Sequence, residues 1–388
     1  MNKKIKVGFI TDDIDRKAMG TALYMQELIK TFATHFNDQV ELIFIYREGK
    51  CKVPVCDLAR RLPIKTFKLP KYTGITSFVR FFFTSKEEFD IIHFPRPKLF
   101  PFFWKLKSKK FVVTFHDAPI KGEWIYRTPA NYIFEWFIKL WGKYHIDAAI
   151  GDADYSARII GEHYGIDHNK IFGIKLAGTI DRGPLTASEI SKQGAYLKEK
   201  YNIVQPYILQ VGRLVPHKNV HRVVKAFDIF KNRSNARHKL VILGGRNHSS
   251  SYDKIVDAEI NNSSFKKDIY IAPYIESEDM AAVYALSDFF VQAGTFDGFS
   301  IPIVDALKMG VPVLTSNRSV FPEIVGNAAI LVDPFNPEDI ATGMEKLASD
   351  PNLKKQLSEL GIKKSLEYNW IKTAEETIGV YKNVLNVQ

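Results

Sequence analysis

The stretch from Asp288 to Pro312 constrains the fold of this chain more than any other. Its apolar beginning, Asp288–Gln292, predicts a buried β-strand. A loop rich in Gly and Asp follows, and Pro302 then stands where a first helical residue is expected, because its fixed φ suits that position. Gly310 and Pro312 end the short helix. A strand, a loop and a helix in this order predict an α/β fold with a mostly parallel sheet.

Two carboxylates flank this corner, Asp297 on the loop and Asp305 about one turn into the helix. A loop carboxylate can accept hydrogen bonds from hydroxyl groups. The backbone N–H groups at a helix start attract anions, phosphate above all. The corner therefore suits a ligand with phosphates and several hydroxyls, such as a nucleotide-sugar. The alternative, from these residues alone, is a solvated turn Asp and an ordinary helical Asp.

A second turn of similar character follows the strand predicted at Pro206–Val211. Gly212 permits close approach of the backbone, Arg213 can grip phosphate oxygens through two parallel hydrogen bonds, and Lys218 adds a point charge. A helix with an apolar face comes next. These residues predict a diphosphate-binding turn, and the alternative is two surface cations beside an ordinary turn.

Chain length, net charge and cysteine content limit which classes of protein this chain can belong to and which partners it can bind. A chain of 388 residues suggests two domains. The net charge of +11 predicts an anionic partner, such as nucleotide phosphates, lipid phosphates, a membrane surface or nucleic acid. Two cysteines, Cys51 and Cys56, are too few for a disulfide framework, so a cytoplasmic location is expected. No apolar run reaches the roughly 20 residues that a membrane-spanning helix needs.

The N-terminal half alternates strand-like and helical patterns, which predicts βαβ units. Gly20, where the first loop meets a helix, could let the backbone approach a diphosphate, or it could be a plain turn glycine. His116 directly follows a predicted strand, where ligands of open α/β sheets bind, although a structural His is the alternative. Strands are predicted in this half at 4–10, 39–46, 90–94, 110–115, 147–151 and 170–176, and helices at 21–32 and 155–164.

The segment Arg96–Lys110 carries six basic and four aromatic residues and no acid. Basic and aromatic side chains together suit an interfacial membrane contact, so this segment is the predicted membrane surface. The alternative is a helix with an aromatic core face and a solvated basic face. RNA binding is a weaker reading, because no nucleic-acid module is recognisable, and we expect no nucleic-acid partner.

The corner around Asp297 and Asp305 resembles the Glu-x7-Glu signature of retaining glycosyltransferases of family 4, within glycosyl transferases group 1. Asp replaces both glutamates of the usual form, and Ser300 replaces its second glycine. Gly212-Arg213-Leu214 with Lys218 is similar to a second signature, in which Asn219 here stands for a glycine. The His116-Asp117 pair is similar to the family pattern whose His contacts the donor sugar.

This resemblance implies the GT-B fold, with two Rossmann-like domains whose parallel sheets face across a cleft. The acceptor domain is expected at 1–185 and the nucleotide-sugar domain at 186–370. A C-terminal helix, 371–388, is expected to cross back to the first domain. The implied activity is that of a retaining hexosyltransferase, which moves a sugar from a nucleoside diphosphate sugar to a hydroxyl of a polysaccharide or lipid-linked glycan. The expected location is cytoplasmic, peripheral on the inner face of the membrane.

The resemblance also assigns roles to residues. Asp305 would hold the ribose hydroxyls, and Asp297 the hydroxyls of the transferred sugar, with His116 near the reacting carbon. Arg213 and Lys218 would neutralise the leaving diphosphate, so no cofactor and no essential metal are expected. The remaining donor-binding positions are Gly20, Gly212, Tyr274 and Ile275 by the base, and the amides of Phe299, Ser300 and Ile301 by the diphosphate.

Three rival functions remain open. A nucleotide-sugar epimerase or hydrolase of the same fold would turn over the donor without an acceptor. A catalytically inactive glycosyltransferase-like subunit that binds a partner protein would explain the two Asp replacements. A dinucleotide oxidoreductase is disfavoured, because no Gly-x-Gly-x-x-Gly follows the first strand. The sequence leaves open the nucleotide base, the sugar, the acceptor and the oligomeric state.

Overall fold

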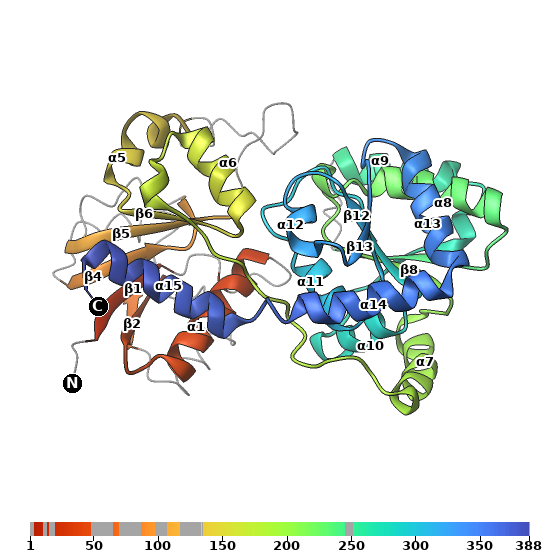
Figure 1. Ribbon diagram of the computed structural model, residues 1–388, viewed down its shortest axis with the longest axis horizontal. Coiled ribbons are helices and arrows are strands. Elements are labelled where there is room, and N and C mark those ends of the chain that lie inside the picture. The colour runs from red at the N-terminus through yellow and green to blue at the C-terminus, as the bar shows by residue number, and fades with distance from the viewer. Residues whose placement is uncertain are drawn as a thin grey trace. The chain divides into compact units, whose positions relative to one another are not determined.

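The chain forms two compact units in the computed structural model, which describes residues 4–10, 14, 20–47, 65–69, 87–97, 107–116, 133, 135–244 and 251–387. The first unit ends at Leu176 and takes in the chain again from Asn369. The second runs from Ala177 to Tyr368. Each unit is a parallel sheet covered by helices (Figure 1).

The first unit contains, within its described residues, a seven-stranded parallel sheet of order β3-β2-β1-β4-β5-β6-β7. The C-terminal parts of β4 and β5 and most of β1 and β6 are buried and mainly apolar, as expected for a parallel sheet with helices on its faces. The strands are β1 Ile5–Ile10, β2 Val40–Arg47, β3 Lys65–Leu69, β4 Glu88–Phe94, β5 Lys107–Phe115, β6 Ala148–Gly151 and β7 Ile171–Gly173. The helices are α1 Gly20–His35, the π-helical turn η2 Ile138–Gly142, α5 Lys143–His145, α6 Asp154–Tyr164, the 3-10 turn η3 His168–Lys170 and α15 Trp370–Leu385.

Helix α15 returns from the end of the chain to the first unit and lies beside α1 (Figure 1). Its Tyr381 hydroxyl lies 2.6 Å from Nδ1 of His93, whose Nε2 lies 2.8 Å from Oγ1 of Thr114. Burial lowers the pKa of His93 to about 3, so the ring is neutral and can donate through one nitrogen while accepting through the other. Thr373 also donates to the carbonyl of Lys175, at 2.7 Å. The predicted attachment of the C-terminal helix to the first domain is therefore confirmed.

The second unit holds, within its described residues, a six-stranded parallel sheet of order β10-β9-β8-β11-β12-β13. Its strands are β8 Tyr207–Val211, β9 Lys239–Leu243, β10 Ile269–Ala272, β11 Phe289–Gln292, β12 Val313–Ser316 and β13 Ala329–Val332. Its α-helices are α7 Ala187–Tyr201, α8 Val220–Ser234, α9 Ser251–Asn262, α10 Met280–Ala285, α11 Ile301–Lys308, α12 Phe321–Val325, α13 Pro337–Ser349 and α14 Pro351–Ser365. Short 3-10 turns are η4 Pro216–Lys218, η5 Lys266–Asp268 and η6 Ser277–Asp279.

Both sheets share one topology, in which the direction of winding reverses between two central strands. In the first unit the reversal lies between β1 and β4, and in the second between β8 and β11. Open α/β sheets bind their ligands beyond the carboxyl ends of strands at such a point. The predicted α/β class with two Rossmann-like halves is confirmed.

Some details differ from the sequence prediction. Strand β5 begins at Lys107 rather than 110, and β7 ends at Gly173 rather than 176. Strand β3 and helices α9 and α14 were not predicted. The units divide at Ala177 rather than at residue 186. The physical reason for that boundary is a buried carboxylate of the second unit, described below.

Candidate active site

Two loops of the second unit meet at the switch point of its sheet. The first leaves β8 through Gly212 and reaches Lys218, and the second leaves β11 and carries Asp297. Lys218 Nζ lies 2.5 Å from Asp297 Oδ2, and both side chains are nearly buried, with 13% and 11% exposed. The structure thus brings the two predicted motifs together through one ion pair.

Asp297 is held in place from several sides. Its Oδ2 also accepts from Nε2 of Gln292 at 3.3 Å. Its backbone N–H lies 3.3 Å from Ser319 Oγ, which lies 3.2 Å from the Asp297 carbonyl. Its Oδ1 has no hydrogen-bond donor in the described part of the chain, so that oxygen is open to a ligand hydroxyl. Sequence reasoning missed Gln292 and Ser319, although a Gln ending an otherwise apolar strand was a usable signal.

The replacement of a glycine by Asn219 has a clear structural explanation. Asn219 has φ 60° and ψ 29°, the left-handed conformation that Gly adopts freely and Asn tolerates. Its Nδ2 donates to the carbonyls of Ala293 at 2.8 Å and Pro334 at 2.6 Å. Asn219 therefore satisfies the backbone requirement and ties the loop after β8 to the loop after β11, which a glycine could not do.

The cations at this turn differ in environment. Arg213 is exposed and forms no ion pair with any described residue. Burial, helped by the charge of Lys218, lowers the pKa of His217 to about 4, so His217 is neutral at pH 7. Its carbonyl accepts from the Thr295 amide at 2.8 Å. Sequence reasoning did not single out His217, which lines the turn without adding charge.

The start of helix α11 has unused hydrogen-bonding groups. Its N-cap residue, Ser300, makes no side-chain capping bond, and its buried Oγ has no hydrogen-bond partner among the described residues. In the part of the chain that the structure describes, the amides of Phe299, Ser300 and Ile301 have no acceptor. The positive end of a helix with free N–H groups is suited to an anion such as a diphosphate.

Asp305, on the first turns of α11, is engaged by the chain itself. Its Oδ1 accepts from the amides of Thr179 at 2.6 Å and Ile180 at 3.1 Å, and its Oδ2 accepts from Thr179 Oγ1 at 2.9 Å. Burial raises the pKa of Asp305 to about 6. These three bonds attach the segment after Ala177 to the second unit, which explains the observed boundary. The predicted role of Asp305 toward ribose stays a prediction, and ribose hydroxyls would have to share these oxygens or displace Thr179.

Gly178 gives a direct test of this contact. A Cβ at Gly178 would lie 2.4 Å from Asp305 Oδ1. We therefore expect Gly178→Ala to lower the free energy of unfolding by about 1–3 kcal/mol, measured by urea denaturation. Gly183→Ala is the matched control, because its Cβ would meet nothing within 4 Å. Equal stability of the two variants would show that the contact with Asp305 is not closely packed.

The other predicted site residues belong to other elements than the Lys218–Asp297 pair. Tyr274 is exposed and Ile275 buried, just after β10 at the edge of the second sheet. Gly20 and His116 belong to the first unit. Gly20 is the exposed first residue of α1, and a Cβ there would meet nothing within 4 Å, so packing does not require a glycine. Its predicted approach to a diphosphate stays a prediction.

His116 has both ring nitrogens occupied. Nδ1 lies 2.9 Å from Oδ2 of Asp152, and Nε2 lies 2.8 Å from the carbonyl of Pro95. Carboxylates and carbonyls only accept hydrogen bonds, so both contacts form fully when the ring carries two protons. This arrangement fixes the orientation of His116 at the carboxyl end of β5. Its predicted contact with a donor sugar remains a prediction.

Comparison with known proteins finds a family resemblance over most of the second unit. The family model of glycosyl transferases group 1 matches residues 197–364. O-antigen chain mannosyltransferase B of Escherichia coli is 26% identical over 231 residues, which cover 59% of each chain. Mannosylfructose-phosphate synthase of Agrobacterium fabrum is 22% identical over 240 residues, 60% of this chain and 52% of that protein. The alignments thus span little more than half the length of these relatives.

Solved structures match the fold over nearly the whole chain. Sucrose-phosphate synthase from Thermosynechococcus elongatus has a TM-score of 0.78 at 15% identity, covering 99% of this chain and 100% of that one. Anabaena HepE in complex with UDP and glucose has a TM-score of 0.77 at 14% identity, covering 97% and 98%. The fold class is therefore the GT-B class of these glycosyltransferases. Residues 197–364, which match the family model of glycosyl transferases group 1, hold the whole Lys218–Asp297 site.

Proposed function

We propose that this chain is a retaining glycosyltransferase that moves a hexosyl group from a nucleoside diphosphate sugar to an acceptor hydroxyl. The observation that carries the proposal is the Lys218–Asp297 pair beside the uncapped start of α11. The N–H groups and the cations offer partners to phosphate oxygens, and Asp297 Oδ1 offers an acceptor to a sugar hydroxyl. A nucleoside diphosphate sugar carries both kinds of group.

The transition state of such a transfer places negative charge on the leaving diphosphate. Lys218 and Arg213 are the groups we expect to neutralise it, which is stabilisation of charge where it develops. We therefore propose that no metal is required. Retention follows if the acceptor attacks from the face that the diphosphate leaves, with a phosphate oxygen taking the acceptor proton.

The donor sugar and the acceptor are suggested by the relatives. The name of the first relative, O-antigen chain mannosyltransferase B, states mannosyl transfer, and the name of mannosylfructose-phosphate synthase states a product that contains mannose. We therefore propose mannosyl as the first sugar to test, and a polysaccharide or lipid-linked glycan as the acceptor. An acceptor of that kind accords with a cytoplasmic enzyme held peripherally at the inner face of a membrane.

A thermal-shift screen tests the donor assignment. A ligand that binds the folded state raises the melting temperature by mass action. GDP, UDP, ADP and TDP, with GDP-mannose and UDP-glucose, should be compared with and without a chelator. We expect one base to give a clear shift that the chelator leaves unchanged. A shift lost with chelator would contradict the proposal that no metal is needed.

Turnover experiments with the donor that binds then distinguish the rival functions. Turnover of the bound donor with a glycan acceptor, with the anomeric configuration of the product determined by NMR, tests retention directly. Donor turnover without an acceptor would favour an epimerase or hydrolase. Absence of any shift would favour a non-catalytic subunit with a protein partner.

A further inference from the structure

The segment from Ile133 to Tyr144, around η2 and α5 of the first unit, exposes an unusual amount of apolar surface. Five large apolar side chains are between 40% and 68% exposed within these twelve positions. Their spacing of three or four residues places most of them on one side of a helix. They are Ile133, Trp136, Leu140, Trp141 and Tyr144. We name these five side chains the aromatic face.

The opposite side of the same segment is firmly attached to the unit. Ile138 is fully buried in the core beside β5 and α6, and Phe137 packs against that core. The π-helical turn at Ile138–Gly142 widens the helix where it passes from buried Ile138 to exposed Leu140 and Trp141. The segment therefore cannot turn the aromatic face inward without withdrawing Ile138 from the core.

Two lysines of the segment have no acidic partner among the residues that the structure describes. Neither Lys139 nor Lys143 forms an ion pair with a described residue, and Lys143 Nζ lies 5.1 Å from the centre of the Tyr144 ring. The acid of the segment, Glu135, lies 3.6 Å from His163 Nε2. Within the described residues of the segment, the aromatic face thus has two lysines beside it, and the acid Glu135 lies near His163.

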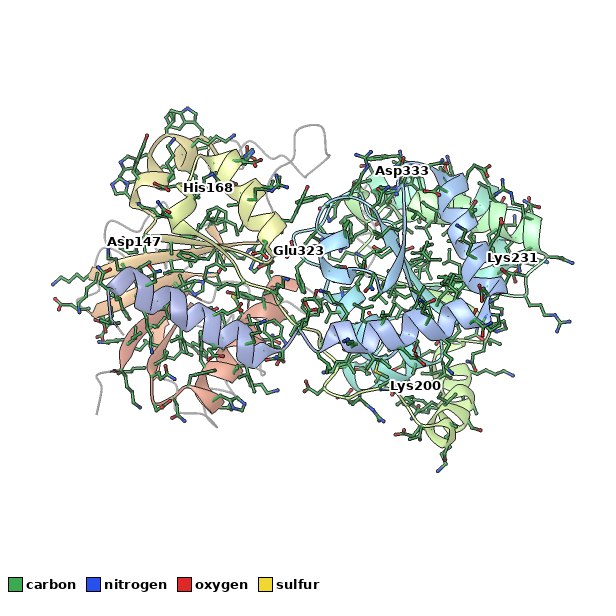
Figure 2. All side chains as sticks on the ribbon, in the orientation of Figure 1. Asp147, His168, Lys200, Lys231, Glu323 and Asp333 are labelled. Carbon is green, nitrogen blue, oxygen red and sulfur yellow. The ribbon has the colours of Figure 1, made fainter. Side chains whose placement is uncertain are left out.

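The basic residues of the predicted membrane segment behave differently. Lys107, Lys109 and Lys110 lie on strand β5, and each is paired with an acid of a neighbouring segment, at 3.6, 2.7 and 2.9 Å. Asp147, labelled in Figure 2, is the partner of Lys110. Residues 98–106 of that segment lie outside the described residues. Paired charges on a strand give little attraction to an anionic surface.

We propose that the aromatic face docks this protein on an anionic lipid surface. Indole and phenol rings favour the boundary between head groups and acyl chains, and lysine ammonium groups beside them attract anionic head groups. Leu140 and Ile133 supply apolar area that enters the boundary. Among the described helices, none is long and apolar enough to cross a bilayer. The proposal deepens the peripheral membrane association proposed above and rests on no residue of the Lys218–Asp297 site.

Vesicle sedimentation tests the docking surface. The intact chain is mixed with vesicles of phosphatidylcholine alone, or of phosphatidylcholine with phosphatidylglycerol, and the bound fraction is measured. We expect binding to the anionic vesicles, and a loss of about tenfold or more in partition for Trp136→Ser with Leu140→Ser. Lys139→Glu with Lys143→Glu should abolish the preference for anionic lipid.

Leu366→Ser is the matched control, because Leu366 is 75% exposed in the second unit and lies outside the aromatic face. It should bind vesicles as the unchanged protein does. Equal weakening by Leu366→Ser, equal binding to neutral and anionic vesicles, or no binding to either would each overturn the proposal. Self-association of the unchanged protein that is lost in Leu140→Ser, without vesicle binding, would assign the aromatic face to a second copy instead. The thermal shift that the donor nucleotide induces in each variant shows separately whether the active site still binds its ligand.

Discussion

Replacing Lys218 by alanine is expected to lower kcat/KM for the donor by about 10²–10³-fold, the usual cost of losing one group that stabilises transition-state charge. Lys218 is the nearly buried cation at the junction of the two site loops, and it also neutralises Asp297, whose Oδ2 lies 2.5 Å from its Nζ. The variant leaves Asp297 without its cation, so repulsion of an incoming diphosphate should add to the loss. Initial rates and the thermal shift with the nucleoside diphosphate measure the two effects.

Lys225→Ala is the matched control for this experiment. Lys225 lies on α8 of the same unit and forms a surface ion pair with Glu259 at 3.2 Å. Exposed pairs of this kind contribute about 0–1 kcal/mol, so catalysis and stability should change little. Diphosphate binding by Lys218→Ala as strong as that of the unchanged protein would show that the ion pair is structural and that the phosphate site lies elsewhere.

Asp305→Asn is expected to change the pH dependence of stability strongly between pH 4 and pH 7. Burial is the main cause that raises the pKa of Asp305 from 3.8 to about 6, partly offset by the bonds from Ile180 and Thr179. Between these two values the folded chain holds a proton that the unfolded chain has released, so stability falls as pH rises through this window. At about 1.4 kcal/mol per pKa unit, the loss by pH 7 is on the order of 3 kcal/mol.

The asparagine variant does not titrate, so it should not lose stability as the pH rises, and it can keep the hydrogen bonds with Thr179 and Ile180. Its Oδ1 can accept both amides that Asp305 Oδ1 accepts, and its Nδ2 can donate to the Thr179 hydroxyl. The difference in unfolding free energy between the unchanged protein and the variant should therefore shift in favour of Asn as pH rises from 4 to 7. Urea denaturation at several pH values measures it.

Asp288→Asn supplies a control of opposite sign. The pKa of Asp288 is lowered in the folded chain by His238 and Lys354, which outweigh its burial. Asp288 therefore contributes stability that is present above its unfolded pKa and is lost on acidification. A pH-independent difference for Asp305→Asn would show that the carboxylate is solvated in solution. Loss of donor binding by Asp305→Asn at unchanged stability would instead support the predicted ribose contact.

Local patterns were sufficient to predict both halves of the fold. Apolar runs that lead into glycine-containing turns predicted β8 and β11 with the ends that the structure has and with starts one residue early, because such strands are buried on both faces. The predictions missed β3 at Lys65–Leu69, whose short sequence contains two lysines, Lys65 and Lys68, and so does not read as an apolar run. The predicted membrane segment also extended into β5. Its composition could not show that its last lysines lie on a strand and are paired with acids, because a basic helix facing solvent has the same composition.

The sequence by itself determined the two motifs of the site, since a glycine turn with Arg213 and Lys218 and a loop with Asp297 are local features. Only the tertiary structure decided which groups are free to act. Winding of the sheet placed β8 beside β11 and so joined Lys218 to Asp297 across 79 positions of the chain. The same folding gave both oxygens of Asp305 to Thr179 and Ile180, 126 and 125 positions away. Hydrogen-bond partners at such separations depend on the path of the whole chain, which no local pattern encodes.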